Sequence, residues 1–222
     1  MATGKAKAAK DDVALKVAVI EAALPHIAFD GFTDRLMERA AKEAGADQDD
    51  VPRLFPNGAL GLLEAYSDSV DAEMEKRLAK VKLTTMPVRK RIATAVKTRL
   101  AILRSHKEAV RRAVAHLSLP QNVALGARLV YRTADAMWRA AGDASTDFNF
   151  YTKRGILAGV YSATLMRWLT DDSEDENATD AFLTARIDNV MLFEKIKGRV
   201  RERAKKLPTL TEVLSGFSAR KS

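Results

Sequence analysis

The amino-acid sequence predicts an all-α protein, and three observations support this fold class. The chain shows no sustained alternation of β-branched and polar residues of the kind that marks a β-strand. Apolar residues recur instead at intervals of three and four, which places them on one face of a helix. With 222 residues, of which 47% are hydrophobic, the chain is long enough to bury one sizeable core.

The N-terminal part is predicted to form a basic tail followed by three helices. Lysines spaced among alanines indicate a disordered tail over residues 1–10. The first helix is expected over residues 11–26, where one stripe is apolar. A second helix begins at Thr33 or Asp34 and ends at Gly45, a residue suited to a left-handed C-terminal cap. A short third helix covers residues 47–55.

Proline and glycine separate the remaining predicted helices. The turn Pro56-Asn57-Gly58 precedes a helix that extends to about residue 81, and Pro87 opens the next one. The later helices are expected over residues 88–105, 106–117, 122–141, 148–169 and 179–197. The last of them could continue through the basic stretch that follows. No internal repeat or linker is evident in the sequence.

Composition argues against catalysis and against a metal site. The chain has no cysteine, which excludes disulfides, thiolate ligands and a cysteine nucleophile. Its three histidines form no ligand pair on one helix face. No Ser-His-Asp arrangement, glycine-rich phosphate loop or paired glutamate motif is present, and Asp143 and Asp147 are more simply helix caps. We therefore expect a protein that is not an enzyme and holds no metal or catalytic cofactor.

The spacing of Gly31-Phe32-Thr33, Ala44-Gly45-Ala46 and Leu54-Phe55-Pro56 resembles the helix-turn-helix unit of the tetracycline-repressor (TetR) family. This resemblance implies a small N-terminal unit, residues 11–57, joined to a larger helical ligand-binding domain, residues 58–197. The third helix, however, carries Asp47, Asp49 and Asp50, which would repel phosphates, and Arg53 alone cannot reverse this. We therefore expect a degenerate unit that binds no nucleic acid.

The helix over residues 155–169 is apolar nearly all round, which predicts a central buried element. Its small side chains, including Gly155 and Gly159, could let helices pack closely or could leave a cavity. The pattern alone favours plain core packing, because protein interiors contain few large voids. An apolar ligand site between helices is the alternative.

The C-terminal segment, residues 198–222, is basic and amphipathic. The net charge of +8 arises largely from a cluster of lysines and arginines over residues 195–206. Beyond it, Leu210, Val213, Leu214 and Phe217 share one helical stripe, as in a helix that dips into an anionic membrane surface. Docking of this helix on the protein's own core or on a dimer partner is the alternative. No apolar run approaches the ~20 residues that a membrane-spanning helix needs.

The tract over residues 137–154, MWRAAGDASTDFNFYTKR, joins aromatic and charged residues across a predicted turn. Ser145, Thr146 and Asp147 suit the start of a helix, and the aromatics that follow cannot all be buried on one helix face. The tract therefore indicates a docking surface for a partner.

With Leu119-Pro120-Gln121-Asn122 upstream, this tract resembles the coenzyme Q (ubiquinone) biosynthesis accessory proteins, the ninth Coq protein of mitochondria and its alphaproteobacterial relatives. The resemblance implies a repressor-like helical protein that has lost DNA binding, forms homodimers, and holds isoprenoid lipid or a quinone intermediate in its larger domain. It also implies that the protein presents this intermediate to the demethoxyubiquinone hydroxylase. The expected location is the bacterial cytoplasm, peripherally associated with the inner membrane surface.

The same resemblance implies a set of partner-binding residues, and helical position indicates a set of lipid-binding residues. The partner-binding set is Met137, Asp147, Phe150, Tyr151 and Arg154. The lipid-binding set follows from helical position and comprises Leu119, Val123, Val130, Ala134, Leu157, Val160, Tyr161 and Leu165. Family members often have tryptophan where this chain has Phe150, so a large apolar anchor is kept and an indole donor is lost. The alternatives are a TetR-like transcription regulator with an apolar effector and a purely structural dimeric scaffold.

Overall fold

The computed structural model describes residues 2–47, 49–145 and 148–205, and these residues form helices without any strand. The α-helices are α1 (Ala2–Asp30), α2 (Asp34–Glu43), α3 (Asp50–Leu54), α4 (Gly58–Leu78), α5 (Val88–Leu103), α6 (Lys107–Leu117), α7 (Val123–Ala140), α8 (Phe148–Leu169) and α9 (Asn177–Lys205). Short 3-10 turns lie at Leu83–Thr85, Arg104–His106 and Glu174–Glu176. The predicted all-α class is confirmed, and each predicted helix has its counterpart.

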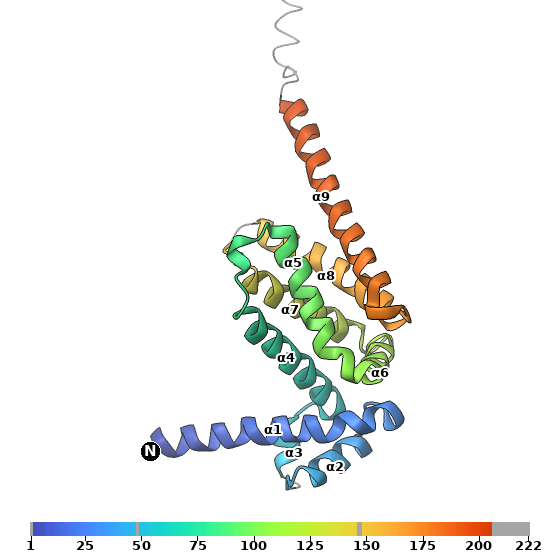
Figure 1. Ribbon diagram of the computed structural model, residues 1–222. Helices are drawn as coiled ribbons and strands as arrows, with labels where there is room; N and C mark the ends of the chain where they lie inside the picture. The colour runs from blue at the N-terminus through green and yellow to red at the C-terminus, as the bar shows by residue number, and fades with distance from the viewer. Residues whose placement is uncertain (1, 48, 146–147, 206–222) are drawn as a thin grey trace, which may run out of the picture.

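Helices α1, α2 and α3 form the small unit at one end of the molecule (Figure 1). Helix α2 begins where the Thr33 hydroxyl accepts a hydrogen bond from the amide of Leu36, which satisfies an otherwise free donor of the first turn. It ends at Glu43, and the φ of +73° at Gly45 just beyond it lets the amide of Ala46 donate to the carbonyl of Ala41 at 2.9 Å. The predicted glycine cap is therefore confirmed.

The disordered tail predicted over residues 1–10 is not what the structure has over the part that it describes. Helix α1 continues back to Ala2 as regular α-helix. Alanine and lysine have high intrinsic helix propensities, so this segment extends the helix that follows it. Figure 1 shows the N-terminal half of α1 projecting beyond the rest of the small unit.

The larger domain consists of α4 to α9, and the small unit packs directly on it. Helix α1 contacts α4 and α6, and the Arg112 side chain donates from Nε to the carbonyl of Ala28 at 3.1 Å. Helix α4 packs on α5 and α7, while α8 packs on α7 and α9. Helix α9 continues through the basic stretch to Lys205, and its C-terminal half extends away from the other helices (Figure 1).

The prediction that residues 155–169 form a central buried element is wrong for one side of α8. Leu157, Tyr161 and Trp168 are buried on its inner face. On its outer face Gly155, Gly159 and Met166 are exposed. Small side chains made this helix look apolar all round in the sequence, but they expose little apolar area when they face outward.

Candidate functional site

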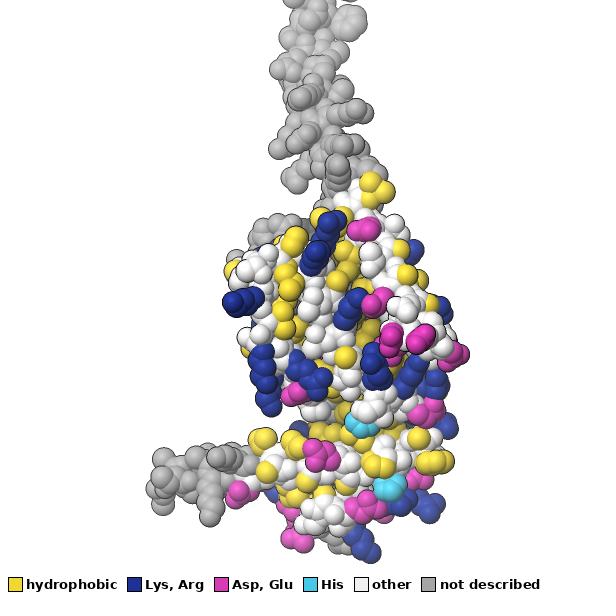
Figure 2. All heavy atoms as spheres, in the orientation of Figure 1, with side chains coloured by type: hydrophobic (Ala, Val, Ile, Leu, Met, Phe, Trp, Pro, Cys, Tyr) yellow, Lys and Arg dark blue, Asp and Glu magenta, His cyan; other side chains and the backbone are white. Residues whose placement is uncertain are grey.

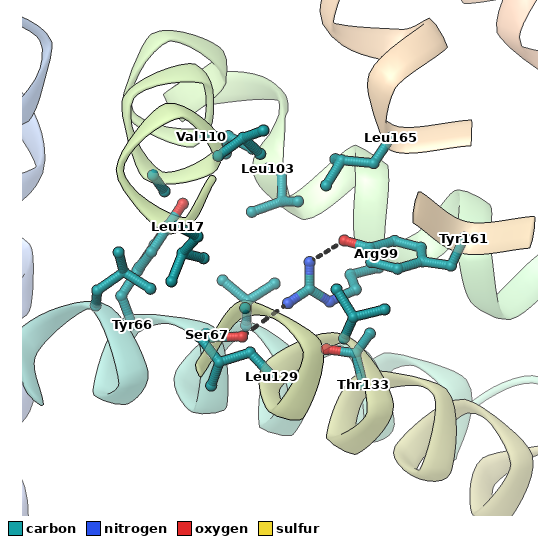
Figure 3. A pocket seen from close by; sticks show the side chains of 16 residues that line it. Tyr66, Ser67, Arg99, Leu103, Val110, Leu117, Leu129, Thr133, Tyr161 and Leu165 are labelled. Atoms are coloured by element: carbon teal, nitrogen blue, oxygen red, sulfur yellow. Dashed lines mark hydrogen bonds between the residues drawn. The ribbon is translucent and has the colours of Figure 1, made fainter. Parts of the chain in front are cut away.

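An apolar pocket lies inside the larger domain, between α4, α5, α6, α7 and α8. Its volume is about 100 Å³, and Figure 3 shows the 16 side chains that line it. Most of its walls are aliphatic, among them Leu63, Val70, Leu103, Val110, Leu129 and Leu165. An aliphatic cavity of this kind favours an apolar ligand, because polar solutes would lose their hydration there.

The structure brings three of the eight predicted lipid-binding residues to this pocket. Val130, Tyr161 and Leu165 line it. Ala134 and Leu157 are buried elsewhere in the core, and Val160 is half-buried. Leu119 and Val123 are exposed at the turn between α6 and α7, because Pro120 and the residues around it separate the two helices there.

Sequence reasoning missed the pocket residues that α4, α5 and α6 contribute. Leu63, Tyr66 and Arg99 are examples. Their periodicity marks them only as inward-facing positions, and nothing local shows which of those positions border a cavity. Arg99 is the exception that could have been noticed, since it stands on the apolar face of α5 between Val96 and Leu103.

A buried polar cluster forms one end of the pocket. The Arg99 guanidinium donates from Nε to Oδ1 of Asp71 at 2.7 Å and from Nη2 to Oγ of Ser67 at 3.2 Å. It also donates from Nη1 to the hydroxyl of Tyr161. The Thr133 hydroxyl donates to Oδ2 of Asp71 at 2.9 Å. These bonds join α4, α5, α7 and α8 across the centre of the domain.

The cluster contains one positive charge, on Arg99, and one negative charge, on Asp71, which neutralise each other. Burial alone would lower the pKa of Arg99, but Tyr161 and Asp71 outweigh burial and raise it. Burial raises the pKa of Tyr161, so its phenol stays protonated. The paired charges of Arg99 and Asp71 leave the site with no net charge to attract a free ion.

Tyr66 lies on another wall of the same pocket. Its side chain is 7% exposed, and its hydroxyl has no hydrogen-bond partner among the described residues. Burial raises the pKa of Tyr66 to about 12, while the charge of Arg99 acts in the opposite direction. The hydroxyl therefore keeps its proton at neutral pH and is a free donor.

The predicted partner-binding residues divide between surface and core. Tyr151 is 65% exposed, and Phe150 is half-buried beside it, with ring centroids 5.1 Å apart in an edge-on arrangement. Met137 is buried in α7, and Arg154 is only 2% exposed. Asp147 lies outside the described residues. Among the described residues of the predicted partner-binding set, only Phe150 and Tyr151 therefore have side chains that a partner could contact.

Arg154 is buried because it organises the turn between α7 and α8. Its guanidinium lies 3.4 Å from the Phe150 ring centroid and pairs with Asp135 and with Asp143, the latter at 3.1 Å. Its position in the tract suggested a free charge, but an arginine that meets two carboxylates and an aromatic face can be buried.

Asp143 acts differently from the helix cap that the sequence predicts. Its carboxylate accepts hydrogen bonds from Lys153 at 2.8 Å and from Ser145 at 2.7 Å, besides its bond with Arg154. Burial would raise the pKa of Asp143, but the bonds from Lys153, Ser145 and Arg154 lower it to about 2. The carboxylate therefore ties the turn to the side chains of α8.

We expect the Asp143→Asn variant to be less stable than the parent protein by about 2 kcal/mol at pH 7. The folded-state pKa lies below the ordinary value of 3.8, so the stabilisation is fully present above pH 4 and is lost as pH falls towards 2. Urea unfolding at pH 7, 4 and 3 measures this. If the difference in unfolding free energy between the two proteins stays constant or grows as the pH falls, the Asp143 carboxylate is not the source of this stabilisation.

The third helix of the small unit offers no free cation for a phosphate. Arg53 pairs with Asp50 within α3 and with Asp12 of α1. Pro52 falls in the first turn of α3, where a missing amide proton costs nothing. Figure 2 shows acidic side chains interspersed with basic ones over the visible face of this unit. These charges support the expectation that the unit does not bind nucleic acid.

The described residues offer neither a membrane-spanning helix nor a cluster of metal ligands. None of their helices is long and apolar enough to cross a membrane. They contain no group of three or more acidic or histidine side chains placed to hold a metal ion. The predicted membrane-contacting residues, Leu210, Val213, Leu214 and Phe217, lie outside the described part of the chain.

Residues 123–194, which cover α7, α8 and much of α9, match the protein-family model described as COQ9. The chain is 32% identical over 179 residues to the mitochondrial ubiquinone biosynthesis protein COQ9 of Rattus norvegicus, covering 78% of this chain and 57% of that protein. It is 30% identical over 179 residues to the Homo sapiens protein of the same name, covering 78% and 56%. The chain thus spans little more than half the length of these relatives.

Among solved structures, a TetR transcriptional regulator from Nitrosomonas europaea has a similar fold, with a TM-score of 0.61 and 19% sequence identity. The similarity covers 78% of this chain and 95% of that one. At this level of identity it concerns the fold alone. The predicted TetR-like all-α fold is confirmed, and so is the resemblance to the ninth Coq proteins.

Proposed function

Since this chain is a homologue of the COQ9 proteins and carries the COQ9 domain at residues 123–194, we propose that it is a lipid-binding accessory protein of ubiquinone biosynthesis. It binds isoprenoid quinone intermediates in the pocket of the larger domain and presents them to the demethoxyubiquinone hydroxylase. It is not itself an enzyme and needs no cofactor, and the lipid is its ligand.

The aliphatic pocket is the observation that carries this proposal. Its volume of about 100 Å³ is smaller than the roughly 150 Å³ of an engineered cavity that binds benzene, so it takes no more than about one isoprene unit. The rest of a prenylated ligand must therefore leave through an opening. Half-buried lining residues cluster on α6 and α7, at Val114, Leu117, Gly126 and Val130. We place the opening between these helices, next to the exposed Leu119 and Val123.

Exposed features of the larger domain support its expected partners. Tyr151 and the half-buried Phe150 offer an aromatic contact for the hydroxylase. Met166 on the outer face of α8, together with Met191 and Leu192 of α9, leaves apolar surface for a second copy of the chain. The protein would work in the bacterial cytoplasm, held peripherally at the inner membrane by its basic C-terminal segment.

We expect the Val130→Phe variant to retain about tenfold less lipid than the parent protein, because the larger side chain fills part of the pocket. A lipid must push this side chain aside to enter, which costs about 1–3 kcal/mol of binding free energy. Mass spectrometry of lipid extracted from the purified full chain measures this. The matched control is Val88→Phe, which makes the same change at an exposed position of α5, outside the pocket lining and away from the proposed opening between α6 and α7. Equal lipid content in all three proteins, or none in the parent, would refute the proposal, as would a failure to bind or stimulate the hydroxylase.

The alternative function is a transcription regulator with an apolar effector. The fold of this chain suits that function, but the charges of its third helix do not. Arg53 is already paired with two aspartates, so counterion release from DNA would contribute little to binding. A DNA-binding titration at low salt distinguishes the two functions. Tight, salt-dependent binding of an operator would favour the regulator.

A further inference from the structure

The turn between α4 and α5 lies in a stretch of the chain that has no acidic residue. Between Glu75 and Glu108 the sequence contains only basic and uncharged residues. The turn joins the end of α4 at Leu78 to the start of α5 at Val88. Four exposed cations lie in it or directly after it, and we call them the basic turn cluster: Lys80, Lys82, Arg89 and Lys90.

The charges of the basic turn cluster are not neutralised by the protein. Within the described part of the chain, none of its four side chains forms an ion pair or a hydrogen bond. The acidic residues that precede the turn are already paired, since Glu73 contacts Lys76 and Arg77. Glu75 pairs with Arg139 of α7 at 2.9 Å. Four free positive charges on one turn attract an anionic partner, and salt weakens such an attraction.

The turn keeps its shape without a partner, because Arg91 binds its backbone. The Arg91 guanidinium donates from Nε to the carbonyl of Met86 at 2.8 Å and from Nη2 to that of Thr84 at 3.1 Å. From Nη1 it also donates to the carbonyl of Ala141, in the turn between α7 and α8, at 3.0 Å. Leu83, which is 6% exposed, anchors the turn in the core. A partner that binds here therefore orders little of the chain, so little conformational entropy is lost.

The basic turn cluster lies toward one end of the molecule. Figure 1 shows the α4–α5 turn at the end of the larger domain opposite the small unit. The C-terminal half of α9, which contains the basic stretch from residue 195, extends beyond the larger domain at the same end. The small unit at the other end carries acidic side chains among its basic ones (Figure 2). Two separate basic segments thus lie toward the same end.

An anionic phospholipid surface is the partner that fits this turn. Val81 lies between Lys80 and Lys82 and is 38% exposed, so an apolar side chain stands among the cations. At a bilayer, lysine and arginine bind lipid phosphates while an apolar neighbour enters the interface. Sites for single-stranded nucleic acid instead use aromatic side chains that stack on bases, and residues 79–90 contain no aromatic residue.

We propose that the basic turn cluster binds the anionic surface of a phospholipid bilayer. This inference rests on the proposed function, since both place the chain at a membrane, but it assigns a contact to the folded larger domain besides the C-terminal segment. Because both basic segments belong to one chain, each raises the effective concentration of the other at the bilayer. Together they hold the larger domain in a defined orientation, whereas a terminal segment alone would leave the domain free to rotate.

The first test removes two charges from the turn. Binding of the full chain is measured to vesicles of equal parts phosphatidylcholine and phosphatidylglycerol, at low and at high salt. The Lys82→Gln/Arg89→Gln variant is expected to bind about thirtyfold more weakly than the parent at low salt, which corresponds to about 1 kcal/mol for each cation. High salt should reduce this difference, because it screens exposed charges.

Arg35→Gln/Lys42→Gln is the matched control. It removes one arginine and one lysine from α2 of the small unit, so its net charge equals that of the turn variant. Both residues are exposed, and neither forms an ion pair or a hydrogen bond among the residues that the structure describes. This control is expected to bind the vesicles as the parent does. All four substitutions are at exposed positions, so neither variant should lose stability.

The second test locates the contact. The chain has no cysteine, so a Thr84→Cys variant carries a single environment-sensitive fluorophore at an exposed position of the turn. Its emission is expected to shift to shorter wavelength when the phosphatidylglycerol vesicles are added. The same label on Glu38→Cys, at an exposed position of α2, should show no shift.

The outcomes separate this inference from the proposed function. Equal vesicle binding by the turn variant and the parent, equal losses in the turn variant and the control, or a Thr84 label that does not respond would each overturn the inference. If the parent still binds the vesicles in those cases, the membrane association stands and belongs to the C-terminal segment. Normal vesicle binding with weaker RNA binding by the turn variant would assign the turn to nucleic acid instead.

A parent protein that binds no anionic vesicles would remove the membrane association together with the inference. The lipid-binding function would not fail with them, because the lipid content of the parent and of Val130→Phe decides it separately.

Discussion

Replacing Asp71 with alanine is expected to destabilise the protein by about 3–5 kcal/mol, because the substitution leaves the buried Arg99 charge without its counter-ion. The Thr133 hydroxyl loses its acceptor at the same time. The bonds of Asp71 join α4 to α5 and to α7, so the loss concerns the centre of the domain. Urea unfolding followed by circular dichroism measures the change.

Asp68 provides the matched control for this prediction. It stands one helical turn before Asp71 on α4 and pairs with Arg132 of α7, but both side chains of that pair are 45% exposed. Asp68→Ala should therefore cost no more than about 1 kcal/mol. Similar losses for the two alanine variants would show that burial of the Asp71–Arg99 pair does not matter. Replacing Asp71 and Arg99 together by leucine and methionine should recover much of the loss.

Replacing Arg154 with alanine is expected to destabilise the protein by about 3 kcal/mol, the low end of the range for a broken buried ion pair. Its side chain is 2% exposed, and its guanidinium contacts Asp135, Asp143 and the Phe150 ring. The substitution leaves a cavity between α7 and α8 and removes one partner from each carboxylate. Asp143 keeps Lys153, which limits the loss.

Tyr151→Ala separates folding from partner binding in the same tract. Tyr151 is 65% exposed, so its truncation should change the free energy of unfolding by no more than about 0.5 kcal/mol. Under the proposed function it should nevertheless weaken binding to the hydroxylase. An Arg154→Ala protein with parental stability and reduced hydroxylase binding would instead support a direct contact role for Arg154.

Much of the helical fold could be predicted from local patterns. The Gly45 cap, the Pro56-Asn57-Gly58 turn and Pro87 each mark a helix boundary that the structure reproduces. These signals are local, because a cap or a proline changes the backbone only within a few residues. The tail over residues 1–10 was predicted incorrectly because its composition suits a helix as well as a solvated chain.

The candidate site was less predictable, and the reasons differ between its parts. Helical position identified Val130, Tyr161 and Leu165 as pocket residues but also selected Leu119 and Val123, which are exposed. An apolar side chain next to a helix end can face the solvent at no great cost, and periodicity does not reveal this. Met137 and Arg154 belong to the tract that carries the family resemblance, but membership of that tract does not show whether a side chain is buried.

The amino-acid sequence by itself determined the helices, most of their boundaries, the degenerate charge of the third helix and the resemblance to the ninth Coq proteins, because these depend on neighbouring residues. Only the tertiary structure decided which face of α8 is buried and how the pocket is built. Arg99 meets Asp71 and Tyr161 across 28 and 62 positions of the chain. Such contacts arise from the packing of whole helices, so the polar cluster at one end of the pocket becomes apparent only when α4, α5, α7 and α8 come together.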